Sequence, residues 1–340
     1  MLAFGLDTFG DVTLADDGTP QSQAQALRDV VAEAVTAEQV GVDAFGVGEH
    51  HRRDFSISAP EVVLAAIAGR TNRMLLGSAV TVLSTDDPVR VFQRFSTLNA
   101  VSNGRAEVIL GRGSFTESYP LFGYDLSQYD ELFETKLARF AELLKGGDPR
   151  VFPPIEQGTL RTWVGVGGSP ESVVRAARYG LPLTLAIIGG SPQRFRSYVD
   201  LYLQSLERFG HPLQPIAVHS PGHVARTDEE AKADLWPHYA AMMTRIGAER
   251  GWPPVTIAQF EREAGPHGAL CVGSPATVAA KIAKTMAALG LSRFNLKYSN
   301  GALPHSARLR SIELFGTEVV PRVREALTDA PLNERPLTGV

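Results

Sequence analysis

The segment Gly41-Val42-Asp43-Ala44-Phe45-Gly46-Val47-Gly48-Glu49-His50-His51 decides how we interpret the fold. Its middle is apolar, and we expect a short buried strand over residues 44–47. The strand stops at a glycine and is followed at once by one carboxylate and two imidazoles. Three titratable groups make a poor core and are more typical of a functional site. In a barrel of parallel strands, catalytic side chains lie at the carboxyl ends of the strands in this way.

Short apolar runs of the same kind recur along the chain and alternate with helical patterns. The expected strands are residues 2–6, 44–47, 74–82, 106–110, 162–166, 183–188, 216–219 and 294–298. Helices are predicted between them by apolar residues at i, i+3, i+4 and i+7, as at Leu27, Val30, Val31 and Ala34. Strands that are apolar throughout indicate a parallel sheet with helices on its faces.

Eight strand–helix units predict a TIM (β/α)8 barrel, a fold of the α/β class. An open, doubly wound sheet is the alternative, but it would leave edge strands to protect. The long connection over residues 222–270 follows the seventh strand, and we expect this insertion on the catalytic face as a lid or a substrate wall. A single domain is expected over residues 1–327, with a loose tail over 328–340.

The composition argues against several classes of protein. The chain has 340 residues, with 33 basic and 37 acidic side chains and a formal net charge of −4. Because it has no basic field and no Lys/Arg run, neither nucleic acid nor a membrane is an expected partner. Cys271 is the only cysteine, so no internal disulfide can form. The N-terminus lacks a signal-peptide pattern, and no apolar run approaches the roughly 20 residues that span a bilayer; we therefore expect a cytoplasmic protein.

The Glu49-His50-His51 cluster could suggest a metal site, which the rest of the sequence does not favour. Adjacent residues at a strand end point to opposite sides, so His50 and His51 cannot easily bind one ion. No HExxH motif and no paired Cys/His spacing is present. We predict no metal, and expect one imidazole in the pocket as an acid, a base or a hydrogen-bond donor, supported by Glu49 or the other histidine. A solvated polar loop is the alternative.

Other strand ends carry polar groups or glycines, which allow close approach to a ligand. Asp7, His219 and Lys297 are among the polar groups. The run Gly167-Gly168-Ser169-Pro170-Glu171-Ser172 fits a capped helix N-terminus, where free N–H groups bind anions such as phosphate. An ordinary capped turn needs the same residues, so both interpretations remain open. Arg112 is a candidate second phosphate ligand, with a structural ion pair as its alternative.

Taken together, these motifs resemble the bacterial luciferase-like flavin-dependent monooxygenases over most of residues 1–325. The matching runs are Gly48-Glu49-His50-His51, Leu76-Gly77-Ser78-Ala79-Val80-Thr81-Val82-Leu83, Pro88-Val89-Arg90, Leu98-Asn99-Ala100-Val101-Ser102-Asn103-Gly104-Arg105, Gly111-Arg112-Gly113 and Gly167-Gly168-Ser169-Pro170-Glu171-Ser172.

The resemblance implies a TIM barrel that uses reduced FMN, usually supplied by a separate NAD(P)H-dependent flavin reductase. It implies that His50 is the catalytic imidazole, with Glu49 and His51 beside it, and that the peptide bond between Ala79 and Val80 is cis. It further implies that the FMN phosphate lies on the arginine and on the glycine-rich turn described above. The implied cofactor-binding residues are Ala79, Val80, Thr81, Arg112, Gly167, Gly168, Ser169 and Ser172.

The implied activity is oxygenation of a small apolar substrate, such as an aldehyde, by reduced FMN and O2. Gly111 stands where luciferase α subunits have a reactive cysteine, which puts long-chain aldehyde luminescence in doubt. Phe115, Tyr119 and Trp252 either line the pocket or belong to the core. Two alternatives remain: a hydride-transfer enzyme that uses a deazaflavin, and a non-catalytic flavin-binding protein. A homodimer is expected by resemblance alone.

Overall fold

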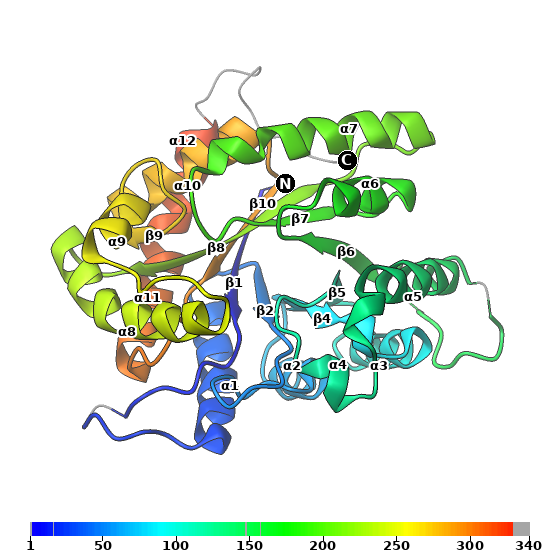
Figure 1. The fold of residues 1–340 in the computed structure, drawn as a ribbon, viewed down its shortest axis with the longest axis horizontal. Coiled ribbons are helices and arrows are strands. Elements are labelled where there is room, and N and C mark those ends of the chain that lie inside the picture. The colour runs from blue at the N-terminus through cyan, green and yellow to red at the C-terminus, as the bar shows by residue number, and fades with distance from the viewer. Residues whose placement is uncertain (1, 16, 147, 157, 329–340) are drawn as a thin grey trace.

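The computed structural model describes residues 2–15, 17–146, 148–156 and 158–328, and these form a closed parallel barrel surrounded by helices (Figure 1). Each barrel strand pairs in parallel with the next, and β10 pairs with both β8 and β1, which closes the barrel. The predicted TIM barrel is therefore confirmed. Its strands are β1 (Ala3–Thr8), β2 (Ala44–Val47), β3 (Leu75–Ser78), β5 (Ala106–Gly111), β6 (Arg161–Val166), β7 (Leu183–Ala186), β8 (Ile216–Val224) and β10 (Arg293–Lys297).

Helices cover the outside of the barrel, and their apolar faces pack against the outward side chains of the strands. Several begin at a serine, threonine or aspartate whose side-chain oxygen accepts an N–H of the first turn, as Ser169 does for Ser172. The covering helices are α1 (Gln23–Gln39), α2 (Pro60–Ala68), α3 (Pro88–Val101), α5 (Tyr129–Leu144), α6 (Pro170–Arg178), α7 (Arg196–Phe209), α10 (Pro275–Leu289), α11 (His305–Leu314) and α12 (Val320–Thr328).

The inside of the barrel is polar below the level of the site. Arg293 Nη1 lies 2.7 Å from Glu107 Oε1, and both side chains are buried. A Cβ atom at Gly77 would lie 2.7 Å from Glu107 Cγ, so the glycine leaves the room that this ion pair needs. The lower barrel is therefore filled by a paired charge rather than by branched apolar side chains, and the open space lies above it.

The predicted third strand, residues 74–82, is interrupted. It consists of β3 and of β4 (Thr81–Val82), and the peptide bond between Ala79 and Val80 that separates them is cis, as the resemblance implied. A short strand that the sequence did not predict, β9 (Cys271–Gly273), pairs with the end of β8. It extends β8 beyond the barrel wall and connects it to the insertion.

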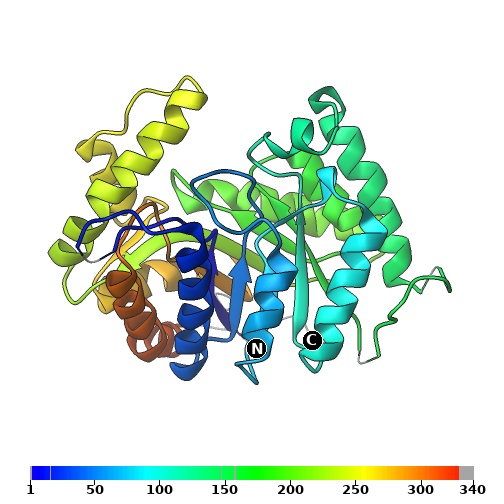
Figure 2. The same ribbon diagram turned by 90° about the horizontal axis from the view of Figure 1, so that it is seen from below.

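The predicted insertion after the seventh barrel strand is present and has a small core of its own. It contains α8 (Asp228–Glu249) and α9 (Ile257–Ala264), which pack together through Leu235, Tyr239 and Phe260. In Figure 2 these helices rise on one side of the open end of the barrel, and the segment with α4 (Ser118–Leu121) rises on the other. The site therefore has a wall on each side.

The C-terminal helix α12 includes Thr328, the first residue of the expected loose tail, and the rest of that tail, residues 329–340, lies outside the described residues. That residues 1–327 are one domain stays a prediction. Within the described part of the chain, the helices are too short or too polar to cross a membrane.

Candidate active site

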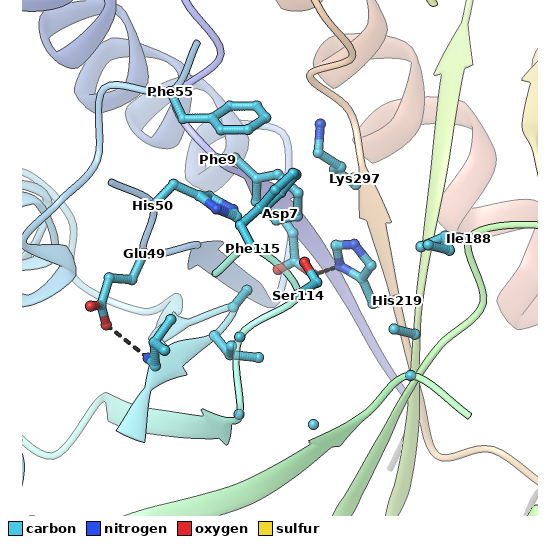
Figure 3. Close-up of a pocket in the computed structure, with 18 of the residues that line it drawn as sticks. Asp7, Phe9, Glu49, His50, Phe55, Ser114, Phe115, Ile188, His219 and Lys297 are labelled. Atoms are coloured by element: carbon cyan, nitrogen blue, oxygen red, sulfur yellow. Dashed lines mark hydrogen bonds and ion pairs between the residues drawn. The ribbon is translucent and has the colours of Figure 1, made fainter. Parts of the chain in front are cut away.

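A cavity of about 450 Å³ opens at the carboxyl ends of the strands, where the sequence placed the site. Figure 3 shows residues from several barrel strand ends in its wall, and one face of α8 completes that wall. Among the predicted site residues, the cavity is lined by Glu49, His50, His51, Ala79, Val80, Arg112 and Gly167. The other predicted residues, which are not among its lining residues, are Thr81, Gly168, Ser169 and Ser172.

The floor of the cavity is formed at Val80, directly after the cis peptide bond. Val80 packs against Ile109 and Trp163 inside the barrel. A Cβ atom at Gly111 would lie 2.5 Å from Val80 Cγ2, and one at Gly165 would lie 2.9 Å from Val80 Cγ1. Glycine is therefore required at both positions for the Val80 side chain to lie where it does, and the floor remains apolar and open.

His50 stands at the edge of this floor among aromatic rings. The centroid of its imidazole is 4.5 Å from that of Phe9, 4.6 Å from that of Phe55 and 5.3 Å from that of Phe115. Burial, and after it the positive charge of Lys297, lowers the pKa of His50 from 6.5 to about 3. Neither ring nitrogen bonds to any residue that the structure describes. A neutral imidazole thus faces the cavity with both nitrogens free for a ligand.

Glu49 and His51 support the floor. The Glu49 Oε2 atom accepts the Val82 N–H at 2.8 Å, and the Glu49 N–H donates to the Val80 carbonyl at 3.0 Å. The remaining carboxylate oxygen, Oε1, lies 2.8 Å from His51 Nε2. Glu49 therefore holds the chain at Val80 and Val82, directly after the Ala79–Val80 peptide bond, and His51 orients Glu49.

A second imidazole lies across Phe9 from His50, and the sequence did not identify its role. His219, at the end of β8, approaches Asp7, at the end of β1: Nδ1 and Asp7 Oδ2 are 2.8 Å apart, and both residues are buried. The Phe9 ring stacks on His219 at an interplanar angle of 10°. Lys297 Nζ lies over the same ring, 4.5 Å from its centroid. All three polar residues stood in the sequence as strand-end groups, which was the available signal.

Of the candidate phosphate ligands, only Arg112 and Gly167 line the cavity, among the residues that the structure describes. Ser169 caps α6, as both interpretations of this turn require, so the phosphate assignment stays a prediction. Gly167 lines the cavity and has no atom within 4 Å of the place where a Cβ would stand. Arg112 Nη1 lies 2.5 Å from the largely exposed Asp130 carboxylate, and its guanidinium lies over the Tyr129 ring. Arg112 is thus paired with an exchangeable partner at the cavity rim.

The wall contributed by α8 is apolar. It presents Tyr239, Met242, Met243 and Ile246, and Trp252 continues it beyond the helix end. Of the three aromatics considered from the sequence, Phe115 and Trp252 line the cavity. Tyr119 is fully buried outside it.

Ion pairs connect the α8 wall to the loops on the opposite side. Arg52 binds Glu117 and Glu249, with Nη2 2.6 Å from Glu249 Oε1, and Arg245 binds Asp54 at 3.1 Å. We call the Arg52–Glu117–Glu249 group the clasp. It holds the end of α8 against the loop that follows His50.

Cys271 is buried, and burial raises the pKa of its thiol to about 11, which disfavours the thiolate that a nucleophile needs. Within the described ranges, no three His, Cys, Asp or Glu side chains are grouped as metal ligands.

Comparison with known proteins places the chain in a family. A family model described as luciferase-like monooxygenase matches residues 8–293. The chain belongs to that family. A relative within it, the alkanal monooxygenase alpha chain of Photorhabdus luminescens, is 27% identical over 236 residues, which cover 66% of this chain and 65% of the relative. The match thus spans just under two thirds of that relative's length.

Solved structures with the same fold bind two kinds of cofactor. The oxygenating constituent of 3,6-diketocamphane monooxygenase from Pseudomonas putida, in complex with FMN, superimposes with a TM-score of 0.76 at 17% identity, covering 95% of this chain and 99% of that one. An F420-dependent secondary alcohol dehydrogenase, in complex with an F420–acetone adduct, gives a TM-score of 0.72 at 15% identity with the same coverage. At these identities the likeness establishes the fold alone.

Proposed function

We propose that this chain is a flavin-dependent monooxygenase that uses reduced FMN and O2 to oxygenate a small, largely apolar organic substrate, for which an aldehyde is one candidate. The observation that carries the proposal is a single cavity that joins an apolar floor at Val80 to a basic, glycine-rich rim at Arg112 and Gly167. Membership of the luciferase-like monooxygenase family supports it.

The residues present fit FMN at both ends of the molecule. Gly111 and Gly165 leave the room that the Val80 side chain occupies, and Val80 gives the cavity an apolar floor against which a planar ring can lie. At the rim, the N-terminus of α6 favours an anion, and Arg112 can exchange the exposed carboxylate of Asp130 for a phosphate. These are the residues that would hold the two parts of the cofactor.

When bound, reduced FMN supplies the electrons that activate O2. The other requirements fall to residues of this chain. His50 is neutral at working pH, so it offers one N–H donor and one acceptor at the edge of the flavin position. Glu49 fixes the floor through its bonds to Val80 and Val82, directly after the cis peptide bond. Aromatic side chains and the α8 wall exclude water from the reacting region.

Flavin binding and turnover of the purified protein test this proposal. Arg112→Gln should weaken binding of FMN about 10- to 100-fold, because a charge-assisted contact to phosphate is lost. Arg139→Gln, which removes a guanidinium on the outer helix α5, is the matched control and should bind FMN as the parent does. His50→Ala should bind FMN normally and consume substrate more slowly in an assay coupled to a flavin reductase. Equal FMN affinity in all variants, or unchanged turnover of His50→Ala, would contradict the proposal.

Two other functions are tested by the same protein sample. A deazaflavin-dependent hydride-transfer enzyme, as in the F420-dependent structure of the same fold, would bind F420 in preference to FMN. A non-catalytic flavin-binding protein would bind FMN but form no oxygenated product with any substrate. The free ring nitrogens of His50 favour a catalytic site over simple storage, since a storage site has no need of an unbonded imidazole in its wall.

Four further expectations accompany this function: supply of the reduced cofactor by a separate NAD(P)H:flavin reductase, a homodimer, a cytoplasmic location and no metal requirement. Turnover that requires an added reductase, and the mass of the protein in solution, test the first two.

A further inference from the structure

The pairing of His219 with Asp7 fixes which of its ring nitrogens carries the proton. A carboxylate only accepts hydrogen bonds, so the His219 Nδ1, 2.8 Å from Asp7 Oδ2, must be the N–H donor. In the neutral ring, Nε2 then carries a lone pair. No residue in the described part of the chain bonds to Nε2, and His219 lines the cavity. The cavity therefore contains a proton acceptor that the protein leaves unused.

Asp7 is placed so that its charge acts mainly on His219. The carboxylate is 1% exposed, and its second oxygen, Oδ1, has no hydrogen-bond partner among the described residues. Asp7 lies in register with Gly46 of β2, and any Cβ at Gly46 would overlap Oδ1. The glycine at position 46 of β2 therefore leaves room for the buried Asp7 carboxylate. Among the described residues, the imidazole of His219 is the one side chain that donates to it. Such a carboxylate stabilises the imidazolium that forms when Nε2 takes up a proton.

We propose that His219 and Asp7 form a proton-accepting subsite for a hydroxyl group of the substrate, and that the substrate is a phenol or a related enol. The inference rests on the proposed function only in that it takes this cavity as the substrate pocket. The subsite lies across Phe9 from His50, so a bound substrate reaches both imidazoles from the apolar interior (Figure 3).

The chemistry of Nε2 selects the hydroxyl. An alkane or a simple aldehyde offers no O–H or N–H donor, so the lone pair would remain unpaired in a buried wall, which is costly. A phenol offers an acidic proton on a planar apolar body, which suits the aromatic rings of Phe9, Phe55 and Phe115. In the transfer, the substrate O–H bond breaks, its electron pair stays on oxygen, and the proton forms the new bond to Nε2. The product is an oxyanion beside an imidazolium that Asp7 holds.

The charged and titratable groups around His219 come from three elements. Asp7 faces it from β1. Lys297, from β10, lies over the shared Phe9 ring, and burial lowers the pKa of this lysine. His50, beyond Phe9, remains neutral because its pKa is about 3. Asp7 is thus the one group among these that bonds to the His219 ring.

Titration of a coloured phenol bound to the flavin-free protein tests the subsite directly. With para-nitrophenol as the probe, the phenolate absorbs in the visible range and the phenol does not. The parent protein should bind the phenolate at least about tenfold more tightly than the phenol, which lowers the apparent pKa of the bound probe by about one unit. In His219→Gln this preference should vanish. Para-nitroanisole, which has a methoxy group and therefore no hydroxyl proton, should bind equally to both proteins.

Two further variants separate a proton acceptor from a merely structural residue. Asp7→Asn keeps the shape but removes the negative charge that stabilises the imidazolium, so the phenolate preference should weaken while para-nitroanisole still binds. His223→Gln is the matched control. His223 is also buried on β8 and pairs with Asp234 at 3.3 Å, but it does not line the cavity, so the preference should remain.

Failure of the parent protein to bind para-nitrophenol, binding with an unchanged pKa, or a preference that survives in His219→Gln would each overturn the subsite. None of these measurements depends on flavin or on O2. A failure here therefore leaves the proposed oxygenation standing, and a protein that bound no FMN could still lower the pKa of the probe.

Discussion

The two sides of Phe9 hold the same side chain in opposite surroundings. On one side His50 is enclosed by phenyl rings and has no carboxylate partner among the described residues, and its pKa falls to about 3. On the other side His219 donates its Nδ1 proton to the buried carboxylate of Asp7. Neither role follows from histidine itself. What lies behind each ring, a phenyl group or a carboxylate, decides which hydrogen bonds its nitrogens can make.

The difference has a simple origin in the strands. His50 follows β2 in a loop, where neighbours come from nearby in the chain, such as Phe55. His219 lies on a strand, and its partner comes from a residue 212 positions away. The surroundings of His50 are thus set by its own loop, whereas the position of His219 is set by the pairing of the barrel strands.

The largest effect should come from Gly46→Ala, which removes the room for Asp7. The added Cβ would overlap Asp7 Oδ1 and lie 3.0 Å from Ala79 Cβ, so both the His219 pair and the floor must shift. We expect a loss of about 3 kcal/mol of unfolding free energy, measured by urea denaturation. Gly189→Ala, at a position with no atom within 4 Å, is the control and should be near neutral. A Gly46→Ala protein as stable as the control would show that Asp7 is not confined by β2.

His50 should make the protein less stable in acid. Its pKa is about 3 in the folded protein and 6.5 when exposed, so between these values the unfolded chain binds one more proton and stability falls as the pH falls. From pH 7 to pH 5 this amounts to up to about 2 kcal/mol. His50→Gln should lose that part of the pH dependence, as followed by urea denaturation at both pH values. The exposed His267→Gln should keep it, and identical profiles for all three proteins would refute the assignment.

The fold and part of the site could be predicted from the sequence, because the end of a strand can be recognised from a few consecutive residues. The run of apolar residues that stops at Glu49-His50-His51 predicts both a barrel strand and the side chains it delivers. The same rule listed Asp7, His219 and Lys297. It could not pair Asp7 with His219, since the pairing depends on closure of the barrel through β10.

The roles of other residues depended on geometry that no local pattern contains. Thr81 was predicted at the cofactor, but its side chain is buried away from the cavity beyond the Ala79–Val80 bend. Ser169 and Ser172 were also predicted there; the first caps α6 and the second is buried in its first turn, and whether this helix start binds a phosphate stays a prediction. A capped turn and a phosphate site require the same residue types, so no local pattern separates them.

A smaller effect tests the electrostatic part of the comparison. The charge of Lys297 is the second cause of the low pKa of His50, after burial. Lys297→Met should therefore raise the pKa of His50 while leaving it below the ordinary value, as read from imidazole NMR signals during a pH titration. Lys281→Met removes another buried lysine, one that binds carbonyl oxygens at the end of α9, and should leave His50 unchanged. A fall in the His50 pKa on removal of Lys297 would reverse the sign of this interaction.

The smallest effect should come from the clasp, which covers the His50 side of the cavity. Glu249→Gln weakens its contact with Arg52, but the carboxylate is half exposed, so we expect a loss of only about 0.5 kcal/mol, less at high salt. Glu318→Gln breaks a comparable exposed pair with Arg322 on the outer C-terminal helix and should cost as little. The two variants should differ in stopped-flow entry of para-nitrophenol, because Glu249, unlike Glu318, ties α8 to the loop after His50. Faster entry in Glu249→Gln alone would show that the clasp limits entry of ligands on the His50 side of the cavity. Equal rates in both variants would show that ligands enter the cavity elsewhere.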